Sequence, residues 1–129
     1  MHIGHVGVYT GDLERLRAFY DRYFGVEVST KYVNEKKQFA SYFVSFPTGA
    51  RLEIMSKASV AGASPAHGED RLGWAHTAVS VGSKEQVDAI TARLADDGYT
   101  VLDGPRRTGD GCYESAVLDP DGNRLELTE

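Results

Sequence analysis

Two histidines and two glutamates in this sequence have the residue types and the spacing of a metal site. His5 is followed 48 residues later by Glu53, and His76 is followed 50 residues later by Glu126. Two imidazole nitrogens and two carboxylate oxygens form a ligand set that suits a borderline divalent metal. Two carboxylates that meet without a counter-charge repel each other, and a divalent cation removes that repulsion. The four residues are therefore candidate metal ligands, although a single histidine in a strand is more often a core or surface residue.

An internal repeat indicates that these four residues belong together. Residues 46–54 (FPTGARLEI) and residues 119–127 (DPDGNRLEL) share Pro, Gly, Arg, Leu and Glu at matching positions, at an offset of 73 residues. A self-match at a fixed offset indicates a duplicated structural unit. Each copy is typical of a Pro/Gly turn that leads into a strand with an apolar face and a face that carries the glutamate. His5 and His76 also match, at an offset of 71 residues.

The apolar periodicity predicts the same order of elements, β-α-β-β-β, in each half of the chain. Alternating residues predict strands, and apolar residues at helical spacing predict helices that end at Gly25 and Gly98. The predicted strands cover residues 3–9, 26–30, 38–46, 51–55, 75–81, 99–102, 113–118 and 124–128, and the predicted helices follow Asp12 and a capping box at Ser83 and Gln86. Residues 31–37 are polar and are assigned no helix or strand, and residues 106–110 are interpreted as a polar turn.

We therefore expect an α+β fold in which two β-α-β-β-β modules form a curved mixed sheet around a metal-binding cleft, with the helices outside. Module one covers residues 1–55, a linker rich in Ala, Ser and Gly covers residues 56–73, and module two covers residues 74–129, all within a single domain, 1–129. The strand neighbours of the four candidate ligands are mostly apolar and are expected to face the helices. The candidate ligands then share the opposite, concave face.

Length and composition exclude several functional classes. The chain has 129 residues and a net charge of −5, and no basic block favours nucleic acid. No apolar run approaches the ~20 residues that a membrane helix needs. The first residues lead directly into a predicted strand without a signal-peptide pattern, and Cys112 is the only cysteine. We therefore expect a cytoplasmic protein without an intrachain disulfide.

The layout and the ending at residues 119–126 (DPDGNRLE) resemble the vicinal oxygen chelate superfamily, which includes glyoxalase I, extradiol dioxygenases, methylmalonyl-CoA epimerase and fosfomycin- and bleomycin-resistance proteins. The resemblance covers nearly the whole chain. It implies that the metal ligands are His5, Glu53, His76 and Glu126. This His-Glu-His-Glu set is similar to that of bacterial glyoxalase I, a lactoylglutathione lyase, which implies Ni²⁺ or Co²⁺ as the favoured cofactor and Zn²⁺ or Mn²⁺ as alternatives.

The same resemblance implies a metal-dependent lyase or isomerase that acts by proton transfer. The bound cation would act as a Lewis acid on two vicinal oxygens of a small substrate and stabilise an enediolate. Glu126 is the first candidate for the catalytic base and Glu53 the second. One alternative is a dioxygenase of the same superfamily, although extradiol dioxygenases have His at the position of Glu53. Another is a non-catalytic small-molecule-binding or antibiotic-resistance protein, although such relatives lack the complete ligand set.

Four further residues are candidates for contacts with the substrate. They are Tyr9, Arg51, Trp74 and Arg124. Trp74 shares a face with His76, and the two arginines share faces with the glutamates, where they could hold an anionic substrate; packing and surface ion pairs are their simpler roles. Tyr9 and Lys57 stand where glyoxalase I is expected to have Arg and Asn. The substrate is therefore either a thiol conjugate or another oxygenated small molecule.

The superfamily members that this chain resembles often complete the site across a homodimer, so the resemblance implies a homodimer. Each module supplies only two candidate ligands, and the two halves must meet within one chain or between two chains. The 18-residue linker could reach ~60 Å at ~3.3 Å per residue and permits either arrangement. His2, on the opposite face from His5, and His67, in the linker, are not expected to be ligands.

Overall fold

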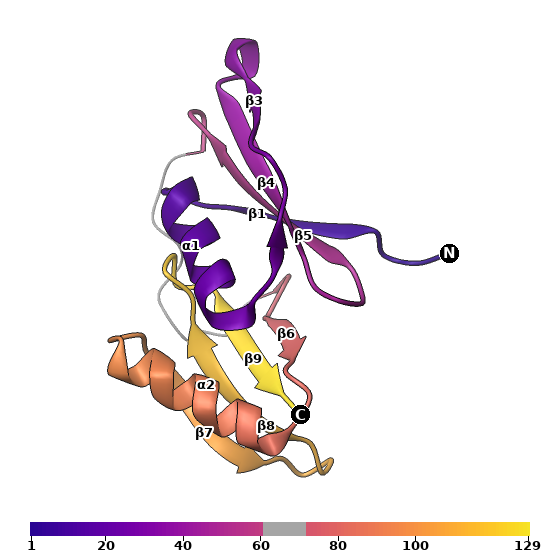
Figure 1. Ribbon diagram of the computed structural model, residues 1–129, viewed down its shortest axis with the longest axis vertical. Helices are drawn as coiled ribbons and strands as arrows, with labels where there is room; N and C mark the ends of the chain where they lie inside the picture. The colour runs from indigo at the N-terminus through magenta and orange to yellow at the C-terminus, as the bar shows by residue number, and fades with distance from the viewer. Residues whose placement is uncertain (61–71) are drawn as a thin grey trace. The chain divides into compact units, whose positions relative to one another are not determined.

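The computed structural model of the chain describes residues 1–60 and 72–129. The chain divides into two compact units, Met1–Ala63 (unit 1) and Ser64–Glu129 (unit 2). Most of the predicted linker, including His67, lies outside the described residues. Each unit has its own sheet and its own helix (Figure 1).

Unit 1 is a β-α-β-β-β motif with one additional short strand. Its elements are β1 (His5–Tyr9), α1 (Leu13–Phe24), β2 (Glu27–Val28), β3 (Tyr32–Asn34), the 3-10 helix η1 (Glu35–Lys37), β4 (Phe39–Ser45) and β5 (Arg51–Lys57). The strands lie in the order β1-β5-β4-β2, and β3 also pairs with β4. The sheet is mixed, because β1 and β5 are parallel and the other pairs are antiparallel.

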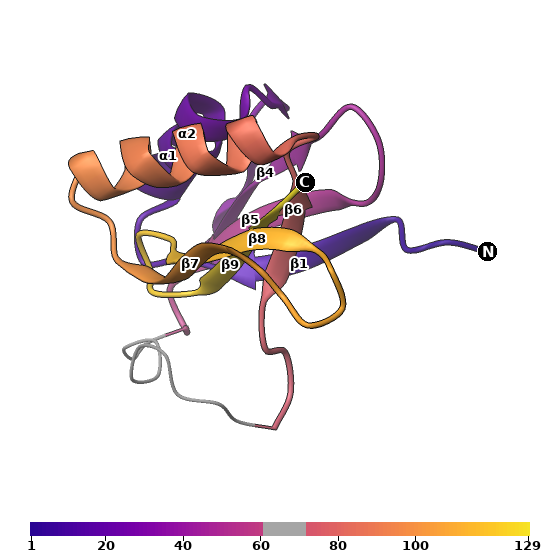
Figure 2. The ribbon, with the colours of Figure 1, turned by 90° about the horizontal axis from the view of Figure 1, so that it is seen from below.

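Unit 2 repeats this motif without the additional strand. Its elements are β6 (Thr77–Ser80), α2 (Lys84–Asp96), β7 (Val101–Arg107), β8 (Tyr113–Leu118) and β9 (Arg124–Thr128). The strands lie in the order β6-β9-β8-β7, with β6 parallel to β9. Figure 2 shows α2 lying over one face of the sheet that contains β7, β8 and β9. The predicted α+β class is confirmed, with one mixed sheet in each unit.

The helices begin and end where the sequence predicts. The side chain of Asp12 accepts a hydrogen bond from the backbone of Arg15 at the start of α1, and Gly25 ends α1 with a φ of 58°. Ser83 caps α2 by accepting from the backbone of Gln86. These bonds satisfy backbone groups that a helix end leaves without partners. Within the described parts of the chain, neither helix is long and apolar enough to cross a membrane.

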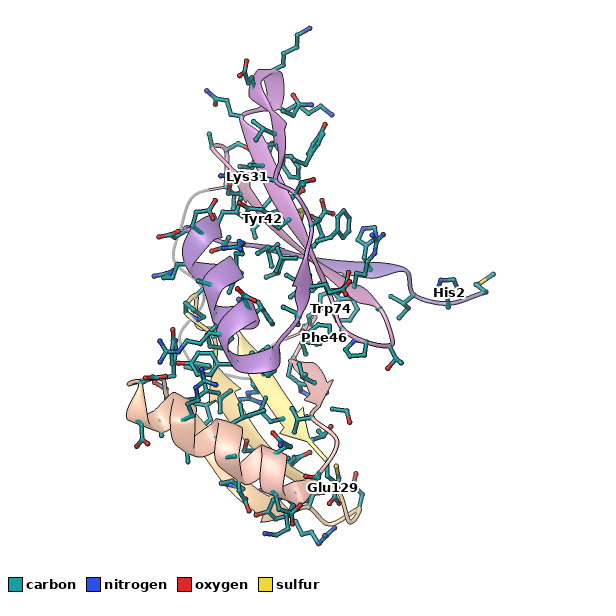
Figure 3. All side chains as sticks on the ribbon, in the orientation of Figure 1. His2, Lys31, Tyr42, Phe46, Trp74 and Glu129 are labelled. Atoms are coloured by element: carbon teal, nitrogen blue, oxygen red, sulfur yellow. The ribbon has the colours of Figure 1, made fainter. Side chains whose placement is uncertain are left out.

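In each unit a tyrosine ties the helix to the third main strand of the sheet. Tyr42 on β4 donates a hydrogen bond to Glu14 of α1 at 3.0 Å, and Lys31 donates to the same carboxylate at 2.9 Å (Figure 3). Tyr113 on β8 donates to Asp88 of α2 at 2.7 Å. The hydrogen bonds from Lys31 and Tyr42 hold the pKa of Glu14 below its usual value. Each unit therefore has a tyrosine–carboxylate hydrogen bond between helix and sheet, although the two tyrosines do not occupy matching positions of the repeat.

The polar residues 31–37, for which no element was predicted, contain β3 and η1. Asn34 stabilises the start of η1 by accepting a hydrogen bond from the backbone of Lys37 at 3.1 Å. Tyr32 and Val33 of β3 are exposed. Backbone pairing with β4 needs no buried face, so the alternation that identifies a half-buried strand is absent from the sequence here.

The prediction of a turn at residues 106–110 is wrong for its first two residues, because β7 continues to Arg107. Register shifts between β7 and β8 mark an irregularity in their pairing. Gly104 lies at this irregularity with a φ of 78°, and a Cβ atom there would stand 2.7 Å from the carbonyl oxygen of Glu114. Only glycine fits such a position. Beyond it, Arg106 pairs with Glu114 across the sheet.

The turn between β8 and β9 is built around the buried carboxylate of Asp119. Its Oδ1 accepts hydrogen bonds from the backbone of Asp121 and Asn123 at 2.9 and 2.8 Å, and its Oδ2 accepts from Nδ2 of Asn123 at 2.8 Å. Burial raises the pKa of Asp119, and the hydrogen bonds from Asn123 oppose this shift. The turn determines where β9 begins and so places Glu126 opposite Ala116 on β8.

We expect Asp119→Ala to lower the free energy of unfolding by about 2–4 kcal/mol, because several hydrogen bonds to one carboxylate are lost together. Asn123→Ala removes only the side-chain bond and should cost about 1 kcal/mol. Urea denaturation followed by far-ultraviolet circular dichroism measures both losses. Equal losses in the two variants would contradict the central role of the Asp119 carboxylate.

Candidate functional site

The first candidate pair lies in unit 2, where β9 runs between β6 and β8. The alternation of β9 buries Leu125 and Leu127 on one face, and Glu126 lies on the other face, where it is partly exposed. His76 directly precedes β6, the parallel neighbour of β9. Its Nε2 atom lies 3.1 Å from Oε2 of Glu126. The structure therefore brings the two candidate ligands of this unit together.

The second candidate pair has the same arrangement in unit 1. β5 runs between β1 and β4, buries Leu52 and Ile54, and carries Glu53 on its other face. Nε2 of His5 lies 3.7 Å from Oε2 of Glu53. The parallel register places Gly7, not His5, beside Glu53. The histidine therefore reaches the glutamate diagonally from the neighbouring strand.

Phe43 on β4 covers part of the face that carries the pair in unit 1. It lies opposite Glu53 in the register of β4 and β5. Its ring meets the His5 ring edge to face, with 5.4 Å between the centroids. The guanidinium of Arg51 lies over the same ring, 4.2 Å from its centroid. These contacts fix both His5 and Arg51 in place.

The distances between donor atoms test whether the pairs fit a metal ion. Two ligands about 2.1 Å from one cation, at about 90–109° to each other, lie about 3.0–3.4 Å apart. The 3.1 Å between His76 and Glu126 falls within this range, and the 3.7 Å between His5 and Glu53 lies just above it. Across residues 1–60 and 72–129, no three or more His, Cys, Asp or Glu side chains are gathered so that they could hold a metal. Each unit thus presents one pair of donors that fits part of a coordination sphere.

The other predicted site residues lie in different surroundings. Tyr9 ends β1 and is 43% exposed, and Trp74 is 84% exposed, which argues against a packed role for Trp74. Arg51 is held by the cation–π contact, and Arg124 borders a hollow in unit 2. His2 is exposed on the segment that precedes β1 (Figure 3).

The hollow in unit 2 has a volume of about 290 Å³ and is bordered by one of the candidate ligands. Its lining comes from β7, β8 and β9 and consists of Leu102, Asp103, Arg106, Glu114, Ser115, Ala116, Arg124 and Glu126. Such a volume suits a small ligand.

Arg106 is one of the residues of this hollow that the sequence analysis did not identify as site residues. Its Nε donates a hydrogen bond to Oδ2 of Asp103 at 2.7 Å, and its Nη2 forms an ion pair with the same oxygen. Its Nη1 lies 3.9 Å from Oε1 of Glu114. The hydrogen bond from Arg106 holds the pKa of Asp103 below its usual value. In the sequence, Gly104-Pro105 is typical of the end of a strand, but β7 continues through these two residues to Arg107.

Comparison with known proteins gives consistent matches over the whole chain. A sequence profile of the Glyoxalase/Bleomycin resistance protein/Dioxygenase superfamily matches residues 2–127. The uncharacterized protein YqjT of Bacillus subtilis (strain 168) is 32% identical over 126 residues, which cover 95% of this chain and 94% of YqjT.

Two solved structures have the same fold. The glyoxalase family protein from Enterococcus faecalis matches with a TM-score of 0.77 at 27% identity, over 99% of this chain and 97% of its own. The trypanothione-dependent glyoxalase I of Leishmania major matches with a TM-score of 0.76 at 20% identity, over 100% of this chain and 86% of its own. At the lower of these identities the likeness shows the fold alone.

Proposed function

Because this chain belongs to the Glyoxalase/Bleomycin resistance protein/Dioxygenase superfamily, we propose that it is a metal-dependent lyase or isomerase of the glyoxalase I type, which moves a proton on a small substrate with vicinal oxygens. The observation that carries the proposal is the pairing of one histidine with one glutamate in each unit, His5 with Glu53 and His76 with Glu126. The superfamily generally binds divalent metals, and paired nitrogen and oxygen donors are suitable ligands.

The proposed ligands are the four residues of these two pairs, which together offer two imidazole nitrogens and two carboxylates. This set favours Ni²⁺ or Co²⁺, with Zn²⁺ or Mn²⁺ as alternatives. A divalent ion held there would supply a Lewis acid for the vicinal oxygens of the substrate. Phe43 supports this arrangement in unit 1, because its ring restrains His5 beside Glu53.

In the proposed mechanism, Glu126 removes the proton from the carbon that bears one of the oxygens and returns it to the adjacent carbon. Glu126 borders the hollow of unit 2, so its carboxylate is within reach of a small molecule that occupies the hollow. Glu53 lies opposite the ring of Phe43 and is the second candidate. Among the predicted substrate contacts, Arg124 borders the hollow, whereas Tyr9, Arg51 and Trp74 stay predictions.

We expect Glu53→Gln and Glu126→Gln each to weaken the binding of Ni²⁺ at least about tenfold, because a neutral amide replaces a charged oxygen ligand. Isothermal titration calorimetry on metal-free protein gives the affinity and the stoichiometry. Glu27→Gln removes the same charge from β2, away from the pair on β5, and should leave both unchanged. Wild-type affinity and stoichiometry in both ligand variants would exclude the four-ligand site.

The activity itself is tested on hemithioacetals made from 2-oxoaldehydes and several thiols. We expect formation of a hydroxy-thioester, measured by its ultraviolet absorbance, that stops with a chelator and returns with Ni²⁺ or Co²⁺. Glu126→Gln should lower kcat by about 10²–10⁴-fold, the usual contribution of a positioned base. Oxygen uptake with catechols would instead favour the dioxygenase, and bound metal without turnover would favour the binding protein.

The proposal includes a symmetric homodimer, because members of the superfamily often act as dimers. Suppose that one chain supplies His5 and Glu53 and its partner supplies His76 and Glu126. A mixed dimer of His5→Ala and His76→Ala chains then contains one intact site and one site with two defects. Random exchange of the two inactive variants should restore about a quarter of wild-type activity.

Light scattering coupled to size-exclusion chromatography provides the control for this mixing experiment, since it gives the molar mass of each variant and of the mixture. A dimeric mass in all samples makes the activities comparable. A monomeric mass with metal bound, or a dimer that regains no activity after exchange, would show that the two pairs meet within one chain.

A further inference from the structure

The two units differ at the position opposite the glutamate of the His–Glu pair. β4 places Phe43 opposite Glu53, and β8 places Ala116 opposite Glu126. The ring of Phe43 is occupied by contacts with His5 and Arg51. At the matching position, Ala116 has only a methyl group, and it lines the hollow of about 290 Å³. The small side chain at residue 116 therefore makes room for a ligand beside Glu126.

The charges around the hollow indicate what kind of ligand it would hold. The lining contains three carboxylates and two guanidinium groups: Asp103, Glu114, Glu126, Arg106 and Arg124. The lining alone thus carries one net negative charge. A divalent ion at His76 and Glu126 would change this to one net positive charge. An anionic group in the hollow would be favoured only with the ion in place.

Arg106 lines the hollow and has one guanidinium nitrogen that no described residue hydrogen-bonds. Its Nε and Nη2 atoms are engaged by the single carboxylate of Asp103. Its Nη1 atom lies 3.9 Å from Glu114, which is too long for a hydrogen bond. In the described residues Nη1 therefore has N–H groups available for a ligand. The strand irregularity at Gly104 fixes the backbone on which Arg106 stands.

We propose that the hollow of unit 2 binds the carboxylate of a small organic acid, with Arg106 as the specificity-determining residue and Ala116 as the residue that makes the room. This inference rests on the proposed function and narrows its substrate class: an acid whose carboxylate stands apart from its two vicinal oxygens. Arg106 and Ala116 lie on β7 and β8, while His76 and Glu126 lie at β6 and β9. The carboxylate and the vicinal oxygens are thus recognised by different strands.

The test uses butyrate and butyramide, which have nearly the same size and differ in charge, and which lack vicinal oxygens that would chelate the metal. Binding to Ni²⁺-loaded and to metal-free protein is followed by ¹H–¹⁵N chemical shifts. We expect the loaded wild type to bind butyrate about tenfold more tightly than butyramide, since a charge-assisted hydrogen bond is roughly twice as strong as a neutral one. The preference should shrink without the metal.

Substitutions assign this preference to individual side chains. Arg106→Gln should bring the ratio of the two affinities close to one, and Arg106→Lys should restore part of it because it retains the charge. Arg107→Gln is the matched control: Arg107 hydrogen-bonds the Gly111 carbonyl and Glu129, does not line the hollow, and should keep the wild-type ratio. An unchanged ratio in Arg106→Gln would overturn the proposal.

Filling the hollow gives an independent readout. Ala116→Phe introduces the residue found at this position in unit 1, and it should weaken the binding of both butyrate and butyramide at least about tenfold while Ni²⁺ still binds. If this variant does not fold, Ala116→Leu tests the same point. Wild-type binding of both probes in a folded filled variant, or no binding of either probe by the loaded wild type, would overturn the proposal. An Arg106-dependent preference for butyrate in a protein without turnover would support the carboxylate site and count only against the proposed reaction.

Discussion

Each unit depends on its last strand lying between two neighbours, β5 between β1 and β4, and β9 between β6 and β8. Because side chains along β9 alternate between the two faces of the sheet, Leu125 and Leu127 are buried on one face and Glu126 lies on the other. A slip of one residue would expose both leucines, at about 1.5–3 kcal/mol each, and would bury an unpaired carboxylate. The packing of the core therefore also fixes the position of the glutamate.

The two units have a similar kind of contact on their helix-facing sides and differ on the opposite sides. In both, a tyrosine on the third main strand donates to a carboxylate on the helix, Tyr42 to Glu14 and Tyr113 to Asp88. On the other face, a phenyl ring in unit 1 restrains a histidine, and a methyl group in unit 2 borders a hollow. Similar scaffolds can thus serve two tasks, to hold ligands firmly and to admit a small molecule.

The sequence predicts those features that arise from local periodicity and from the repeat. The adjacency of His76 and Glu126 follows from two parallel strands with the same alternation, and the helix ends follow from Asp12 and Gly25. The strand β3 could not be predicted, because its side chains are largely exposed and show no apolar alternation. Arg106 was assigned to a turn for a related reason: the irregularity at Gly104 interrupts the alternation, and only the pairing with β8 shows that the strand continues.

The irregular pairing at Gly104 has a consequence for how such a protein can diversify. A strand irregularity interrupts the regular ladder locally and redirects the side chains beside it, often next to a functional site. Substitutions on β7 can therefore change the lining of the hollow while the buried leucines of β9 stay the same. Ligand recognition by β7 and core packing by β9 thus depend on different residues. One fold can then serve different chemistries.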